Sequence, residues 1–286
     1  MMLSSGTTSG IDRNSEDQFE RRYCLSLTVV DGCSEGATRI VEPNGAECRL
    51  GRNAAGNTLV IPESGVSRLH CVFFSKTTAE GADADSETEG GPPSDPFRAP
   101  QQERAGPSVT KFFVKDLGST TGTFLFLKPK CEFALFKGLF LRLSESEFVV
   151  CELTSDKCEL FFYEGPVSGK QIAVPAGAGR FVLGRLSADL PALSGDSTLS
   201  GQHAVIEYSP PCSWTLTDLG SSNGTSCRLS AEREESGAHE VLDQDILQLG
   251  CSRIKCKIQQ VSGSGARNEQ DQFSYGSAIQ RAMRNL

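Results

Sequence analysis

The chain has 286 residues, of which 38% are hydrophobic and 22% charged, and its net charge is −8. This is the composition of an ordinary globular protein, and it excludes a low-complexity or collagen-like chain. No apolar run reaches the roughly 18 to 20 residues of a membrane helix, and residues 1–22 lack the apolar centre of a signal peptide. We therefore expect an intracellular protein, nuclear or cytoplasmic, without membrane insertion.

Most of the negative charge lies in residues 79–108. This segment holds seven acidic residues and two arginines, so it accounts for −5 of the net charge of −8. It is also rich in Gly, Pro and Ser and poor in large apolar residues, which predicts a long disordered acidic loop. The rest of the chain is nearly neutral, so we expect no direct nucleic-acid partner.

Short runs rich in β-branched and aromatic residues, separated by Gly, Pro, Asn and Ser, predict strands. In the first half of the chain these runs lie at 23–30, 37–42, 69–74, 111–117, 139–143 and 147–153. In the second half they lie at 159–165, 170–175, 180–185, 203–209, 214–219, 245–250 and 254–261. No stretch before residue 270 has a helical period over three turns, so we predict an all-β protein.

Three short motifs occur twice in the same order. The first copies are LGR at 50–52, SRLH at 67–70 and DLGS at 116–119, and the second copies are LGR at 183–185, SGQH at 200–203 and DLGS at 218–221. The first two pairs are offset by 133 residues and the third by 102. The difference of 31 matches the length of the acidic segment, which separates SRLH from DLGS in the first copy only. A duplicated unit with one insertion explains both offsets.

Many short strands in each copy predict two tandem β-sandwiches. The expected first domain spans 22–154, with the disordered loop 79–108 inserted in it, and the expected second domain spans 157–261. The junction at 154–157 is too short for a flexible tether, so we expect a restricted relative orientation. Residues 1–21 are expected to form a disordered tail, and 262–286 a second tail.

A catalytic Ser–His pair is one interpretation of SRLH and SGQH, because His70 and His203 each follow a serine by three residues. In a strand this spacing puts the two side chains on opposite faces, which does not suit a nucleophile and its base. The only acids at matching positions, Asp116 and Asp218, end strands and are better explained as braces of a turn. We therefore predict that the protein is not an enzyme.

Two glycine-rich stretches resemble nucleotide-binding loops but lack their spacing. Residues 165–171 (GPVSGKQ) are one residue short of a phosphate-binding loop, and residues 175–184 (PAGAGRFVLG) lack a dinucleotide fingerprint. Both precede strands, so we expect turns there and no cofactor. The eleven cysteines include no Cys-x-x-Cys pair, which favours buried free thiols over a metal site or a disulfide framework.

The repeated motifs do suit an anion site. Loops at one end of a sandwich cluster, so an Arg, a Ser and a Ser/Thr-x-Gly turn can converge there. Arg offers a fork of donors that matches phosphate oxygens, the hydroxyl offers a short hydrogen bond, and the turn exposes backbone N–H groups. Each piece is common alone, but the ordered recurrence of all three favours a phosphate site in each copy.

These motifs resemble the forkhead-associated (FHA) domain, a β-sandwich module that recognises phosphothreonine in partner proteins. The resemblance covers about residues 22–261. It implies phosphopeptide contacts in the first copy at Arg52, Ser67, Arg68 and Thr120, with Thr121 where the family has the Asn that holds the peptide backbone. It implies contacts in the second copy at Arg185, Ser200, Ser222 and Asn223, with Gly201 at a position that is often basic or amide-bearing. It implies structural roles for Gly51, His70, Gly122, Gly184, His203 and Gly224.

The resemblance therefore implies a non-enzymatic signalling adaptor that binds phosphothreonine-containing proteins, without metal or cofactor. The alternative is a structural scaffold in which one or both domains bind partners independently of phosphate. A further hypothesis is self-association, in which an acidic loop phosphorylated at Thr77, Thr78, Ser86 or Thr88 occupies a site in the same or another molecule. We also expect Thr121 to be strained, because a β-branched residue tolerates positive φ poorly.

Overall fold

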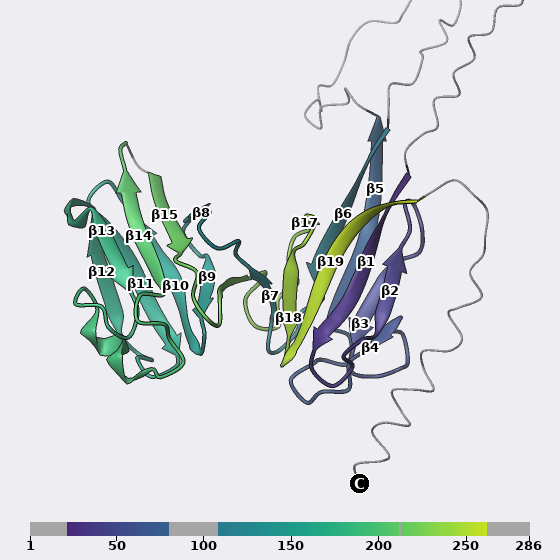
Figure 1. Ribbon diagram of the computed structural model, residues 1–286, viewed down its shortest axis with the longest axis horizontal. Coiled ribbons are helices and arrows are strands. Elements are labelled where there is room, and N and C mark those ends of the chain that lie inside the picture. The colour runs from purple at the N-terminus through teal and green to yellow at the C-terminus, as the bar shows by residue number, and fades with distance from the viewer. Residues whose placement is uncertain (1–21, 80–107, 212, 262–286) are drawn as a thin grey trace, which may run out of the picture.

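The computed structural model describes residues 22–79, 108–211 and 213–261 (Figure 1). These ranges form nineteen strands and two short 3-10 helices, η1 (Ala176–Ala178) and η2 (Pro191–Gly195), which confirms the predicted all-β class. No helix in them is long and apolar enough to cross a membrane. The two predicted tails and nearly all of the acidic loop lie outside the described residues; β5 ends at Ala79 and β6 begins at Ser108.

The strands pack into two units, each a sandwich around its own core (Figure 1). The first unit contains β1 (Arg22–Asp31), β2 (Thr38–Val41), β3 (Cys48–Gly51), β4 (Leu59–Val60), β5 (Cys71–Ala79), β6 (Ser108–Asp116), β7 (Thr123–Phe126), β17 (His239–Val241), β18 (Ile246–Leu249) and β19 (Ser252–Val261). The second contains β8 (Glu132–Ala134), β9 (Phe140–Leu143), β10 (Ser146–Leu153), β11 (Lys157–Glu164), β12 (Gln171–Pro175), β13 (Arg180–Leu183), β14 (Ala204–Ser209), β15 (Ser213–Asp218) and β16 (Thr225–Arg228).

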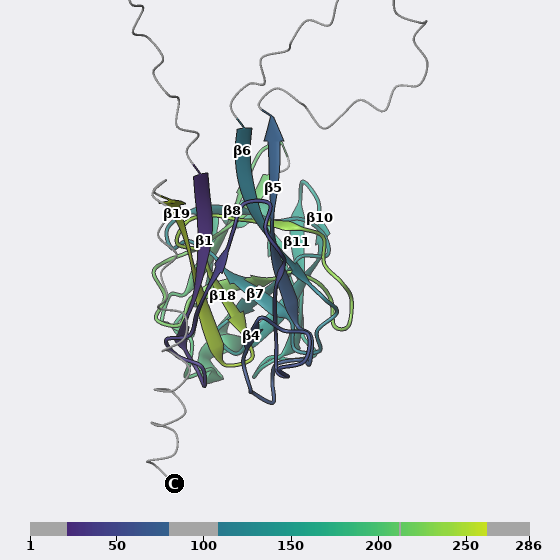
Figure 2. The ribbon, with the colours of Figure 1, turned by 90° about the vertical axis from the view of Figure 1, so that its right-hand side faces the viewer.

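The two halves of the chain exchange their last three strands. Strands β17 to β19 come from the second half but belong to the first unit, where β19 pairs with β1 and β17 pairs with β6. Strands β8 to β10 come from the first half but belong to the second unit, where β8 pairs with β15 and β10 pairs with β11. The exchange is visible in Figures 1 and 2, in which the yellow-green C-terminal strands lie among the purple and blue N-terminal ones.

The hydrophobic cores follow the exchanged arrangement. One core joins residues between Leu25 and Val114 to residues between Leu229 and Cys256, and the other contains only residues between Leu127 and Cys227. In the described residues, one unit therefore consists of 22–79, 108–126 and 229–261, and the other of 127–211 and 213–228, which differs from the expected boundaries of 22–154 and 157–261. The repeat determines the order of the strands, but it carries no information on which copy each strand joins.

The two units share one ten-stranded sheet, in the order β12-β11-β10-β9-β16-β7-β18-β19-β1-β2. Its centre is the antiparallel pair of β7 and β16, in which Leu125 lies opposite Cys227. Just beyond the two strands the main chain bonds continue, from Leu127 N to Thr225 O at 2.8 Å and from Leu229 N to Thr123 O at 2.9 Å. The restricted orientation expected from a short linker thus arises from a continuous sheet.

The segment expected to join two domains is a turn inside the second unit. Residues 154–156 connect β10 to β11, which begins at Lys157. The indole of Trp214 donates a hydrogen bond to Thr154 O at 2.8 Å. The glycine-rich stretch 165–171 is a hairpin turn between β11 and β12, as expected. The other stretch, 175–184, is a crossover between two sheets that contains η1, and not a hairpin.

The exchange predicts the behaviour of a chain cut at this turn. Both Ser155 and Asp156 are exposed, so a site-specific protease sequence can be inserted between them. Cleavage there leaves each fragment with strands of both units, and we expect the fragments to remain together and to co-elute in size-exclusion chromatography. Denaturing urea, as the control, should separate them. Fragments that elute apart under native conditions would contradict the exchange.

Candidate functional site

Three loops of the first unit meet at one end of its sandwich. They follow β3 at Arg52, precede β5 at Ser67 and Arg68, and follow β6 at Thr120 and Thr121. All five residues line an open hollow of about 810 Å³, and all except the half-buried Ser67 are exposed. The structure thus brings together every contact residue that was predicted for the first copy.

The hydroxyl of Ser67 lies at the centre of these loops. Arg52 N donates to Ser67 O at 2.9 Å, and Thr120 N donates to Ser67 Oγ at 3.2 Å. Because the hydroxyl oxygen already accepts from a backbone N–H, its own proton remains available for an acceptor in the hollow. The loops therefore orient Ser67 as a donor in the hollow that Arg52 and Arg68 also line.

His70 connects the second loop to the third. Ser67 N donates to His70 Nδ1 at 3.1 Å, so the ring proton is on Nε2, which donates to Gly122 O at 3.1 Å. Burial lowers the pKa of His70 although Asp116 opposes the shift, which favours the neutral ring that this geometry needs. Both ring nitrogens of His70 are thus bonded to backbone groups and neither to the Ser67 hydroxyl, so the two side chains do not form a nucleophile–base pair.

The carboxylate of Asp116 organises the DLGS turn. Its oxygens accept from Ser119 N at 2.7 Å, Ser119 Oγ at 2.7 Å and Thr123 Oγ1 at 2.6 Å, and Ser119 Oγ accepts from Gly122 N at 3.0 Å. Asp116 is completely buried, so a substitution would leave several donors without a partner.

The second copy repeats this turn through Asp218. Its carboxylate accepts from Ser221 Oγ at 2.7 Å and Thr225 Oγ1 at 2.6 Å. Burial opposes ionisation of Asp218, but the hydrogen bonds from Thr225 and Ser221 outweigh it and lower the pKa. Both aspartates were predicted to brace a turn, but their Ser and Thr partners were not predicted, although these recur at equal spacing in the two copies.

Gly51 allows the first two loops to approach each other. A Cβ at this position would lie 2.3 Å from Arg68 O and 2.6 Å from Asn57 Nδ2, which is closer than real Cβ contacts. At the equivalent Gly184, a Cβ would lie 2.4 Å from Gly201 O. These two glycines fit the structural role that was predicted for them, because no side chain has room there.

Thr121 replaces a hydrogen bond that Asn223 makes in the second copy. The hydroxyl of Thr121 donates to Gly65 O at 2.5 Å, and Asn223 Nδ2 donates to Thr198 O at 2.8 Å. Gly65 and Thr198 are equivalent, since they are 133 residues apart. The expected strain at Thr121 is wrong, because the positive φ of the turn falls on Gly122, at 90°.

The second site has the same backbone framework. Arg185 N donates to Ser200 O at 3.1 Å, and Ser222 N donates to Ser200 Oγ at 3.0 Å. His203 Nδ1 accepts from Ser200 N at 3.4 Å, and its Nε2 donates to Gly224 O at 3.1 Å. The predicted residues of the second copy are thus brought together by the contacts seen in the first.

The second site differs in what it presents to solvent. Gly201 stands where the first copy has Arg68, and a Cβ on Gly201 would lie 2.9 Å from Leu186 Cδ1. Leu186 is 74% exposed, so an apolar side chain lies where the first site has a cation. Arg185 Nε donates to Leu199 O at 3.0 Å, which occupies one of its donors. The second site therefore offers fewer free positive donors.

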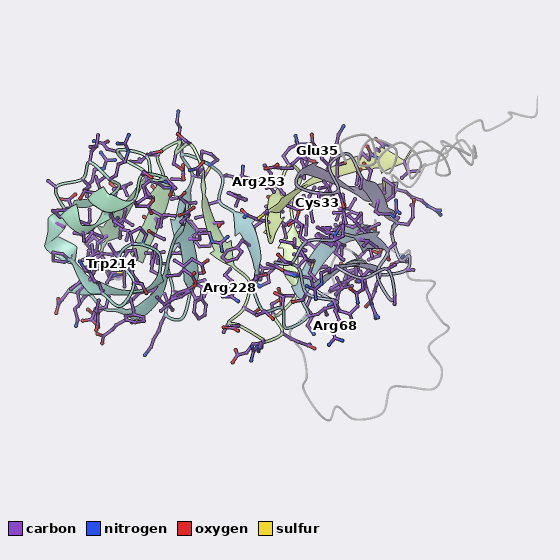
Figure 3. The ribbon with its side chains drawn as sticks, turned by 90° about the horizontal axis from the view of Figure 1, so that it is seen from below. Cys33, Glu35, Arg68, Trp214, Arg228 and Arg253 are labelled. Carbon is purple, nitrogen blue, oxygen red and sulfur yellow. The ribbon has the colours of Figure 1, made fainter. Side chains whose placement is uncertain are left out.

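The exchange places one residue of each half behind the site of the other half. Arg228, at the end of β16, donates from Nη2 to Thr120 O at 3.0 Å, and a Cβ on Gly122 would lie 2.4 Å from its Nε. Figure 3 shows Arg228 between the two units. Phe126, at the end of β7, has the equivalent position behind Gly224, with 2.8 Å to a Cβ there. These two contacts could not be predicted from the sequence, because they depend on which strands of the two halves lie side by side.

In each unit, a buried carboxylate links the second loop of the site to an exchanged hairpin by hydrogen bonds. Glu63 accepts from Cys33 N at 3.1 Å, from Cys251 N at 2.9 Å and from the Ser252 hydroxyl. Burial raises the pKa of Glu63, but these hydrogen bonds outweigh burial and lower it overall. In the second unit Asp196, equivalent to Glu63, accepts from Ser146 Oγ at 2.8 Å. In the described parts of the chain, no group of three or more His, Cys, Asp or Glu could hold a metal ion.

Comparison with known proteins identifies one family. The family model described as FHA domain matches residues 48–131 and 181–250. Among solved structures, the kinase-interacting FHA domain of kinase associated protein phosphatase from Arabidopsis is 14% identical, with 84% of this chain and 98% of that chain covered and a TM-score of 0.33. The MEK1 FHA domain is 12% identical, with 83% and 90% covered and a TM-score of 0.30. No curated protein matches the chain.

The close approach at Gly51 predicts a cost for any added side chain. Gly51→Ala should lower the free energy of unfolding by roughly 1 to 3 kcal/mol, because the contacted atom is a backbone carbonyl that cannot rotate away. The matched control is Gly177→Ala, at a residue with no atom within 4 Å of an added Cβ and without positive φ. Urea denaturation measures both, and equal effects would contradict this explanation.

The buried histidines predict a loss of stability on mild acidification. Burial lowers the pKa of His70, which faces Asp116 and Arg228, and of His203, which faces Asp218 and Asp196. The unfolded chain then binds protons before the folded chain does, so their contribution is complete above about pH 6.5 and decreases as the pH falls toward the folded pKa.

We expect the free energy of unfolding to fall between about pH 7.5 and 5 by at most about 1.4 kcal/mol per pH unit for each such histidine, with His239 adding to the effect because burial also lowers its pKa. The measurement is urea denaturation at several pH values. His70→Gln and His203→Gln should each reduce the slope. Carboxylates with lowered pKa values, such as Asp218, change the free energy of unfolding only at lower pH, outside this window. A flat wild-type profile in this window would contradict the prediction.

Proposed function

Because the chain belongs to the FHA domain family, whose members are phosphothreonine-binding modules, we propose that it is a non-enzymatic, intracellular adaptor that docks on phosphothreonine-containing proteins. The observation that carries the proposal is the arrangement around Ser67. Its hydroxyl, oriented by Thr120 N, lies in one hollow with the exposed Arg52 and Arg68.

The chemistry of this hollow suits a phosphate group. A phosphothreonine carries about −1.5 to −2 charges and three acceptor oxygens. Two guanidinium groups and one hydroxyl offer complementary donors, and each charge-assisted hydrogen bond contributes roughly 1.5 to 3 kcal/mol. In this proposal Arg52, Arg68, Ser67 and Thr120 hold the phosphate. Thr121 contributes less to the peptide than an Asn would, since its hydroxyl is bonded to Gly65 O.

The second site takes a secondary part in this proposal. Arg185, Ser200 and Ser222 would contact the phosphate, and Asn223 would contact the peptide backbone through its oxygen Oδ1, an acceptor that Thr121 lacks. Asn223 uses its amide within the protein, bonding Thr198 O and Ser144 Oγ. With Gly201 in place of a cation, we expect weaker phosphate binding than at the first site. The shared sheet limits the relative motion of the two sites, so two-site binding raises affinity only for partners with matching spacing.

The second candidate function is phosphate-independent binding by the second unit. The observation that favours it is Leu186, which is 74% exposed beside Gly201 and gives this site an apolar character. The first unit would then read phosphate and the second unit would act as a scaffold.

Self-association through a phosphorylated acidic loop requires that a kinase can reach the candidate residues. Thr77 and Thr78 lie in β5, paired with β6, and the Thr77 hydroxyl is 3.0 Å from Thr110 Oγ1. Thr77 is half-buried, which makes it a poor kinase substrate, whereas Thr78 is exposed. Thr78 therefore remains a candidate, and Ser86 and Thr88 lie outside the described residues.

Calorimetric titration of the full chain tests the proposal with matched threonine, phosphothreonine and phosphoserine peptides. Of the three peptides, wild type should bind measurably only the phosphothreonine peptide. Arg52→Ala should weaken this binding about 10- to 100-fold, because a charge-assisted hydrogen bond is lost. Arg185→Ala should leave this binding unchanged and abolish a second, weaker binding event at the second site. Arg49→Ala is the matched control, because Arg49 lines the same hollow but pairs with Glu47 at 3.0 Å. Equal binding of phosphorylated and unphosphorylated peptides by all variants would overturn the proposal.

A further inference from the structure

Two exposed cysteines lie where the exchanged hairpin of the second half meets the first strand. Cys33 follows β1, and Cys251 is in the turn between β18 and β19. Figure 2 shows β1 and β19 side by side, and their ladder ends at the pair Asp31 and Arg253. Just beyond this pair, Cys33 lies in the turn that follows β1, and Cys251 lies in the turn that precedes β19.

Contacts beyond the last ladder pair bring these two turns together. A Cβ on Gly32 would lie 2.8 Å from Ser252 Cα, so Gly32 lies directly against Ser252. One residue further, Cys33 N and Cys251 N donate to the two oxygens of the single carboxylate of Glu63, at 3.1 Å and 2.9 Å. The two cysteines are therefore held at one point by a shared acceptor.

This juxtaposition suits a disulfide. Cys33 and Cys251 are each next in sequence to one member of the contacting pair Gly32 and Ser252, and their backbone N–H groups share one carboxylate. Disulfides join Cα atoms about 4.4 to 6.8 Å apart, so such a close approach is what the bond needs. Both thiols are exposed and accessible to an oxidant. The expectation of buried thiols is therefore wrong for these two residues, and also for the exposed Cys131.

The second unit shows that the fold does not require cysteines here. Gly165 is equivalent to Gly32, and a Cβ on it would lie 2.8 Å from Ser146 Cα, so the same strand contact exists. At the next equivalent pair, however, Pro166 and Glu145 stand in place of the two cysteines. The pair is thus a property of the first unit alone.

We propose that Cys33 and Cys251 form a reversible disulfide site that locks the exchanged C-terminal hairpin to the N-terminal strand. With glutathione disulfide as oxidant, the two thiols lose two protons and two electrons and form one S–S bond, while the S–S bond of glutathione disulfide breaks and yields two glutathione thiols. The exchange passes through a mixed disulfide. In a reducing compartment such a bond is transient, as in redox sensors.

The bond would act on the first site through Glu63. The carboxylate of Glu63 anchors the loop that carries Ser67 and Arg68, and its partners are the backbone N–H groups of both cysteines and the Ser252 hydroxyl. Oxidation fixes these donors relative to each other and closes a loop that contains most of the chain. The disulfide therefore stabilises the exchanged first unit and the anchor of its second loop.

Equilibration of the native full chain in a glutathione redox buffer, followed by alkylation and tryptic mass spectrometry, tests the site. We expect residues 23–39 linked to 234–253, with fragment ions that assign the bond to Cys33 rather than Cys24. The link should be lost in Cys33→Ser and in Cys251→Ser and kept in the control Cys131→Ser. Oxidation should raise the Tm by roughly 5 to 15 °C in wild type and not in Cys33→Ser.

Two results would overturn the proposal. One is glutathione attached to both cysteines without the 23–39/234–253 link, which would show that they do not meet. The other is a link without a rise in Tm, which would show that the bond does not lock the unit. Neither readout involves a phosphopeptide, so the outcome is independent of the proposed function.

Discussion

Strands β7 and β16 pair antiparallel in the middle of the ten-stranded sheet, and each is the last strand that its half of the chain adds before crossing to the other unit. This short pairing joins two sandwiches whose cores are otherwise separate. Because the chain crosses in both directions at this point, each unit receives its final three strands from the other half. The integrity of either core therefore requires both halves.

The exchange also determines how the loops are held. Each site takes its solvent-facing residues from one half, but the second loop of each site is anchored by a hydroxyl of an exchanged strand, through Glu63 and Ser252 in the first unit and Asp196 and Ser146 in the second. Arg228 adds a contact from the second half to Thr120 O. The first site is thus assembled from both ends of the chain, although every residue predicted for it lies in the first half.

The sequence was sufficient to predict the all-β class, most strands and the three loops, because these depend on local patterns such as β-branched runs and Gly-rich turns. It could not predict the exchange, since strands β8 to β10 and β17 to β19 are equivalent and satisfy either unit. The residues missed at the first site follow from this. Arg228 becomes its neighbour only through the exchange, and the hydrogen bond of Thr121 requires the position of Gly65 in space.

The two copies differ mainly where their residues face solvent. The hydrogen bonds of Asp116 and Asp218, of His70 and His203, and of Ser67 and Ser200 are the same in kind, because the aspartates and histidines are buried and the loops that they hold place the two serines alike. At the exposed positions, by contrast, Arg68 corresponds to Gly201, and Leu186 covers the space beside it. A buried framework that orients loops can thus be retained while the groups it presents diverge. The shared fold accordingly gives the second site the same loop geometry as the first, but a different surface to offer a partner.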